Sequence, residues 1–166
     1  MVDLWPILVF VAETLALQLI GLDEDGIDLK FTISGKNKLD RKELQGESGI
    51  RTLKTQLQAA RPKTPKDPIN AHPTDMLQIL NEIFKEYLKP QNPKKTTLIV
   101  LTDGLWPGTH PPNKLQDRIS QFVKEQLHPR ELDDRHFSIG FVRIGSAGKQ
   151  RLDYLDDQFH KDYDLP

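Results

Sequence analysis

The stretch that decides the fold is TTLIVLTDGLW, residues 96–106. The apolar part of this stretch holds too little polarity for a strand with one wet face, so it predicts a central parallel strand, residues 97–103. The strand ends on Asp103, and Gly104 and Trp106 come shortly after it. Burying a carboxylate without a partner is expensive. We therefore expect Asp103 to cap a turn, bind a metal ion, or act as an acid or base.

Strands and helices alternate on both sides of this stretch. Further strands are expected at 27–34 and 137–145, and helices at 5–20, 49–60, 74–89, 114–127 and 150–163. Thr74 and Asp75 are expected to supply the N-cap and a first-turn acid for the third of these helices. Residues 35–47 read as a surface loop, and four prolines exclude helix and central strand from 61–73. This order predicts one α/β domain spanning residues 1–166, with helices on both faces of the sheet.

The composition excludes several classes of function. The chain has 166 residues, a formal net charge of −1 and no cysteine. Near-neutral charge argues against a nucleic-acid partner, which usually needs a basic face. The lack of cysteine removes disulfides, thiolate zinc sites and a cysteine nucleophile, and it suits an intracellular, cytoplasmic location. The sequence contains no P-loop, GxGxxG or GxSxG motif, so it does not support nucleotide binding or a serine nucleophile.

The apolar stretch at residues 4–22 has two interpretations. A signal peptide would have a basic n-region, and here no Lys or Arg precedes Lys30. Glu13 and Gln18 interrupt the run, and Pro6 suits a first helical turn. We interpret it as a buried helix of a protein without a membrane partner, and the alternative of a signal or anchor segment stays open.

The candidate site lies where the central strand ends. Ligands of open α/β sheets bind outside the carboxyl ends of the parallel strands. Gly104 allows a sharp turn there, and the loop after it carries Trp106 and His110. We expect Gly104, Trp106 and His110 to contact a partner, with Trp106 as an exposed anchor or, alternatively, packed on the sheet. His72 also lies on a loop expected at this end.

Four motifs in order support a resemblance to a known family. They are DGIDLKF at 25–31, HPTDMLQIL at 72–80, LIVLTDG at 98–104 and FSIGFVRIG at 137–145. Together they resemble a von Willebrand factor type A (vWA) domain, closest to the intracellular vWA domains of fungal proteins. The resemblance implies a Rossmann-like, mostly parallel sheet with helices on both faces. It also implies a metal-ion-dependent adhesion site, where a magnesium ion accepts a carboxylate from a partner protein.

The same resemblance implies that the site is incomplete. Thr74 and Asp103 match the family's threonine and strand-end aspartate, but the chain has no DxSxS motif. Neither the first strand, which carries that motif, nor the last strand has a counterpart, so we expect a partial domain, truncated at both ends. A magnesium ion held by one hydroxyl and one carboxylate would bind weakly. Strands 27–34 and 97–103 would then pair directly or recruit a strand from a partner.

These observations lead to one expected function and two alternatives. We expect a protein-interaction module without catalysis, which binds an acidic side chain of a protein partner at the top of the sheet. The first alternative is a small metal-dependent α/β hydrolase using Asp103, which would need a second carboxylate and a base nearby. The second alternative is a truncated remnant with no function of its own.

Overall fold

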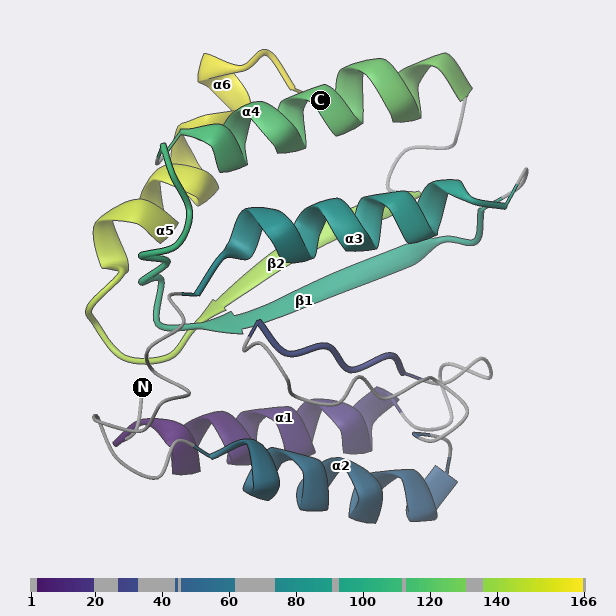
Figure 1. The fold of residues 1–166 in the computed structure, drawn as a ribbon, viewed down its shortest axis with the longest axis vertical. Helices are drawn as coiled ribbons and strands as arrows, with labels where there is room; N and C mark the ends of the chain where they lie inside the picture. The colour runs from purple at the N-terminus through teal and green to yellow at the C-terminus, as the bar shows by residue number, and fades with distance from the viewer. Residues whose placement is uncertain are drawn as a thin grey trace. The chain divides into compact units, whose positions relative to one another are not determined.

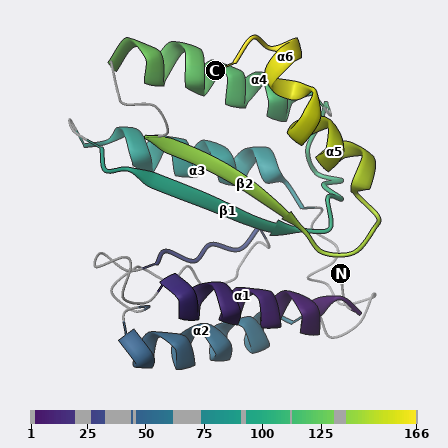
Figure 2. The same cartoon turned by 180° about the vertical axis from the view of Figure 1, so that it is seen from behind.

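The chain divides into two compact units, residues 1–72 and 73–166, which are treated separately below. The computed structural model describes residues 3–19, 27–32, 44, 46–61, 74–90, 93–111, 113–130 and 136–165. Figures 1 and 2 show these residues as coloured ribbon. The expectation of a single domain over residues 1–166 stays a prediction.

The first unit is built on two helices, α1 (Trp5–Leu19) and α2 (Gly46–Ala60), which lie side by side in both views (Figures 1 and 2). Trp5 is buried, and its Nε1 donates a hydrogen bond to the backbone oxygen of Leu57 at 3.0 Å. The buried residues of α1 are Trp5, Leu8, Ala12 and Ala16, spaced along one helical face. The apolar sequence led us to expect that most faces of α1 are buried. This expectation is wrong for the opposite face, where Phe10 is 69% exposed.

Both predicted helices of this unit are confirmed, and no helix within the described residues has the length and apolarity to cross a bilayer. The predicted strand 27–34 is not formed over its described part. Only Leu29 takes part in a β-bridge among residues 27–32. The other residues of that prediction, most of the 35–47 loop, and residues 62–73 lie outside the described part of the chain.

The second unit contains a parallel pair of strands, β1 (Thr96–Thr102) and β2 (Phe137–Arg143). The register runs from Thr96 opposite Phe137 to Thr102 opposite Arg143. The predicted parallel pairing is confirmed. The expectation that β1 is buried on both faces is wrong: Leu98 and Val100 pack on the core, whereas Ile99 between them is 37% exposed.

Helices cover one face of this sheet in both views (Figures 1 and 2). They are α3 (Met76–Leu88), α4 (Lys114–Gln121), α5 (Lys149–Asp157) and α6 (Phe159–Asp162). A π-helix, η2 (Phe122–Leu127), and a 3-10 turn, η3 (His128–Arg130), continue α4. The described chain is therefore a mixed α/β fold. Helices on both faces of a larger, Rossmann-like sheet stay a prediction.

Aromatic rings form the centre of the second unit. Phe84 and Phe122 are both fully buried, and their rings stack with centroids 3.9 Å apart. The ring of Phe137 meets both edge-on, at 5.7 and 5.0 Å. Phe122 and Leu127, five residues apart, both contact this core, a spacing that the wider π-helical turn brings onto one face.

Candidate functional site

At the end of β1, the side chains of two consecutive residues, Thr102 and Asp103, each accept a hydrogen bond from the backbone N–H two residues later. Thr102 is 4% exposed, and its Oγ1 accepts hydrogen bonds from Gly104 N at 3.0 Å and Trp106 Nε1 at 2.9 Å. Asp103 is 9% exposed, and its Oδ1 accepts a hydrogen bond from Leu105 N at 3.0 Å. Such contacts fix a turn without help from a ligand. Of the three roles expected for Asp103, turn capping is the one that these bonds show.

A close approach of two backbones locks this turn onto the next loop. Gly104 has φ of +76°, a conformation that glycine adopts without steric cost. A Cβ added at Gly104 would lie 2.6 Å from the Cα of Gly148, and one added at Gly148 would lie 2.3 Å from the backbone oxygen of Asp103. Gly148 precedes α5, so the loop after β1 and the loop after β2 are packed backbone to backbone. Gly104, expected to contact a partner, is buried in this contact.

Trp106 is buried beneath the loop and is not the exposed anchor that its position allowed. It is 3% exposed, and its ring lies 5.8 Å from that of Phe141, measured between centroids. The guanidinium carbon of Arg151 sits 5.2 Å from the centroid of the Trp106 ring, a cation–π geometry. Arg151 Nη1 also lies 3.5 Å from the backbone oxygen of Gly104. The structure therefore shows the alternative role of Trp106, packing on the sheet.

A second set of hydrogen bonds ties the far end of the loop to the start of α3. Gly108 N donates to the backbone oxygen of Thr74 at 3.0 Å. Thr109 is 3% exposed; its Oγ1 accepts from Met76 N at 3.1 Å and donates to Asp75 Oδ1 at 3.4 Å. The loop from 103 to 109 is thus held at both ends.

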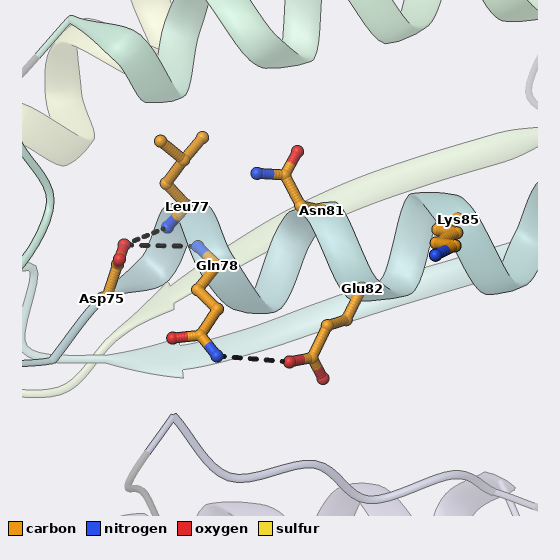
Figure 3. Close-up of a pocket in the computed structure, with 6 residues that line it drawn as sticks. All are labelled: Asp75, Leu77, Gln78, Asn81, Glu82 and Lys85. Atoms are coloured by element: carbon orange, nitrogen blue, oxygen red, sulfur yellow. Dashed lines mark hydrogen bonds between the residues drawn. The ribbon is translucent and has the colours of Figure 1, made fainter.

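The N-cap of α3 is Asp75, and the Thr109 hydroxyl accepts from the first N–H of the helix, which corrects the expected roles of Thr74 and Asp75. Asp75 Oδ1 accepts hydrogen bonds from Leu77 N at 3.0 Å and Gln78 N at 3.2 Å (Figure 3), and the first turn holds no acid. The sequence predicted where the helix starts but not that Thr109 contacts its cap. Thr109 lies 34 residues after Asp75, and no local sequence pattern connects the two.

The exposed part of the loop differs from the residues singled out in the sequence. His110 is exposed as a loop residue, whereas Gly104 and Trp106 are buried. Leu105 lies between those two buried residues and is 52% exposed. The sequence signal for Leu105 was its place between a turn glycine and a large aromatic residue. His72 lies outside the described residues.

The predicted magnesium ligands, the Thr74 hydroxyl and the Asp103 carboxylate, stay a prediction. Asp103 Oδ1 already accepts a hydrogen bond from Leu105 N. Within the described ranges, no group of three or more His, Asp or Glu residues is placed to hold a metal ion. One carboxylate and one hydroxyl would leave most of the octahedral shell of a magnesium ion to water, so we expect such a site to bind weakly.

A separate hollow lies on the outer side of α3 (Figure 3). Its polar groups contact one another or neighbouring residues: Gln78 Nε2 donates to Glu82 Oε1 at 3.4 Å, and Asn81 Oδ1 accepts from Arg118 Nε at 2.6 Å. Asp75, also part of the lining, is committed to the helix cap. These side chains do not converge on a common point, so the hollow is a surface groove of α3 and not a chemical site.

No family model matches this chain, and searches of curated proteins and of solved structures found no match either. The site therefore has to be interpreted from its own geometry. The vWA resemblance stays a prediction from the sequence.

Proposed function

We propose that this chain is a protein-interaction module, and that the loop from Asp103 to His110 is its binding surface. The observation that carries the proposal is the presentation of Leu105. Its apolar side chain is 52% exposed, while its own backbone N–H is held by the Asp103 carboxylate at 3.0 Å. The residues on each side of it, Gly104 and Trp106, are buried.

A loop fixed in this way favours binding, because little conformational entropy remains to be lost when a partner docks. The Gly104–Gly148 contact and the hydrogen bond from Gly104 N to Thr102 act on the loop backbone, and the Thr109 side chain ties the far end of the loop to α3. An exposed apolar side chain on a rigid turn is the kind of group that fills a partner's pocket at the centre of an interface. The resemblance to vWA domains, whose partners dock at this end of the sheet, agrees with the proposal.

The chemistry of the site supports binding without catalysis. The Asp103 carboxylate accepts the backbone N–H of Leu105 and so serves the turn. The proposal does not include a magnesium ion, because Asp103 Oδ1 is engaged in the turn. We include an intracellular setting in the proposal, supported by the lack of cysteine.

Photo-crosslinking from defined positions tests the proposal. A benzophenone amino acid would be placed at Leu105 or His110, with Lys124 on the far helix segment as an exposed control position. In the cell of origin, we expect the same protein adduct from positions 105 and 110 and its absence from position 124. Leu105→Ser should reduce the adduct formed from position 110. Identical adducts from all three positions, or adducts unaffected by Leu105→Ser, would refute the proposal.

A further inference from the structure

Arg151, in the first turn of α5, contacts both chain neighbours of the exposed Leu105. Its guanidinium carbon lies 5.2 Å from the centroid of the Trp106 ring, and its Nη1 lies 3.5 Å from the backbone oxygen of Gly104. In both views the loop after β1 and the start of α5 lie at the same end of the sheet (Figures 1 and 2). All four residues belong to the second unit. The cation is therefore held against the same turn that exposes Leu105.

The helix α5 gives Arg151 no acidic partner. Side chains three and four positions apart on a helix are neighbours, and for Arg151 these positions hold Ala147, Gly148, Tyr154 and Leu155. Within the described part of the chain, no carboxylate forms an ion pair with Arg151. Lys149 and Arg143 differ in this respect, because both lie within ion-pair distance of Asp153. Arg151 is therefore the cation of α5 and β2 whose charge the described residues leave uncompensated.

The contacts of Arg151 leave most of its hydrogen-bonding capacity unused. A guanidinium carries five N–H donors in a planar fork whose geometry matches a carboxylate. Stacking on Trp106 uses the flat face of the group and not its N–H edge, and the contact of Nη1 with Gly104 is long, at 3.5 Å. The Arg151 side chain is partly exposed. Because the stacking already holds the fork, less conformational entropy is lost when a carboxylate binds to it.

We propose that the protein partner presents an acidic side chain to Arg151, beside an apolar side chain that packs against Leu105. This inference rests on the proposed function, because it uses the same loop, and it adds the chemistry of the partner segment. Residues 104–111 contain no acid, and the Asp103 carboxylate is buried in the turn. An acidic partner would therefore meet a cation at this turn and no exposed acid of the loop.

A single uncompensated cation favours a carboxylate over a phosphate group. A phosphorylated side chain carries about −1.5 to −2 charge at neutral pH and is typically bound by a cluster of arginines. The other cations of β2 and α5, Arg143 and Lys149, are shared with Asp153 and do not add to such a cluster. The one guanidinium of Arg151 suits the single charge of an Asp or Glu side chain, which it can bind through two parallel hydrogen bonds.

NMR titration of the full-length chain tests this chemistry at Arg151 itself. The probe is a blocked leucine–glutamate–leucine tripeptide, and two comparison peptides carry glutamine or phosphoserine at the centre. We expect the glutamate peptide to shift the Nε–Hε resonance of Arg151. We expect the glutamine peptide to bind about tenfold more weakly, the loss that one charge-assisted hydrogen-bonded pair implies. Equal affinity for glutamate and glutamine, no shift with either, or tightest binding of the phosphoserine peptide would overturn the proposal.

Matched variants separate the charge of Arg151 from its packing on Trp106. Arg151→Gln should bind the glutamate and glutamine peptides equally, and salt should no longer weaken the binding of the glutamate peptide. Arg151→Lys, which keeps the charge but not the fork, should retain a smaller preference for glutamate. Lys149→Gln removes a cation that already pairs with Asp153, so it should keep the full preference. If Arg151→Gln weakens both peptides by the same factor and keeps the preference, Arg151 only supports the loop and the proposal is wrong.

Photo-crosslinking from position 110 distinguishes this inference from the proposed function on which it rests. In the cell of origin, we expect Arg151→Gln to reduce the adduct by about tenfold and Lys149→Gln to leave it unchanged. An adduct that Arg151→Gln does not reduce would keep the loop as the binding surface and remove Arg151 from it. Adducts that do not depend on the loop at all would refute the proposed function, and this inference with it.

Discussion

The contact between Gly104 and Gly148 makes Gly148→Ala the sharpest test of the site. The new Cβ would lie 2.3 Å from the backbone oxygen of Asp103 and 2.3 Å from the Cα of Gly104. Both are backbone atoms, so no side-chain rotation relieves the clash and the two loops have to move apart. Overpacking of this kind costs about 1–3 kcal/mol of unfolding free energy, and a rigid backbone contact belongs near the upper end of that range.

A smaller effect acts in the opposite direction. Gly148 has φ of −93° and ψ of 16°, which alanine adopts without strain. Replacing glycine there stabilises the fold by about 0.4–1 kcal/mol, because the unfolded chain loses conformational freedom. The net expectation is a loss of about 2 kcal/mol for Gly148→Ala.

Gly140→Ala is the matched control, since a Cβ at Gly140 meets nothing within 4 Å. It should be neutral or slightly stabilising, by about 0.5 kcal/mol. Urea unfolding would be followed by tryptophan fluorescence in a Trp5→Phe background, so that Trp106 in the second unit is the only reporter. If the two alanine variants unfold at the same urea concentration, the close approach of the two loops is wrong.

Three further predictions concern the cap, the metal and the C-terminal helix. Asp75→Ala should lower the unfolding free energy by about 1 kcal/mol by removing the cap of α3, while Asp75→Asn should retain most of it; urea unfolding measures both. Magnesium at millimolar concentration should leave the melting temperature unchanged in wild-type protein and in Asp103→Asn; a rise of several degrees that only Asp103→Asn abolishes would restore the metal site. The hydrogen bond that Tyr163 OH donates to Asp117 at 2.7 Å, with some burial, raises the pKa of Tyr163 to about 12. Because this folded-state pKa lies above the ordinary value of 10, the stabilisation is fully present below pH 10 and is lost as pH rises through 12. Alkaline unfolding followed by circular dichroism should show this loss in wild-type protein and not in Tyr163→Phe.

Helix positions followed well from the sequence because apolar spacing reports which residues face a core. The expected helix at 74–89 appears as Met76–Leu88, and that at 114–127 begins at Lys114 as expected. The apolar spacing did not predict the change to a π-helix after Gln121. A short pattern of apolar residues does not distinguish the number of residues per helical turn. The last helix, expected as continuous over 150–163, divides at Gln158 into α5 and α6.

The candidate site was predicted only in its location. Asp103 and Gly104 were identified as the end of a strand and the start of a turn, because local chemistry decides both. The burial of Trp106 and the role of Thr109 depend on residues distant in sequence, Phe141 and Arg151 for the former and Asp75 for the latter. Contacts of this kind leave no trace in a local pattern, so the sequence left the packing of Trp106 open and missed Thr109.

The glycine contact also has a mechanical consequence. Since the backbone of Gly104 rests on that of Gly148, a force applied to Leu105 is passed directly to the residue before α5. The first turns of α5 carry Lys149 and Asp153, and Asp153 also lies 3.8 Å from Arg143 at the end of β2. The loop and the start of α5 are therefore expected to move as one unit, so a displacement of the loop would also strain the ion pairs of Asp153.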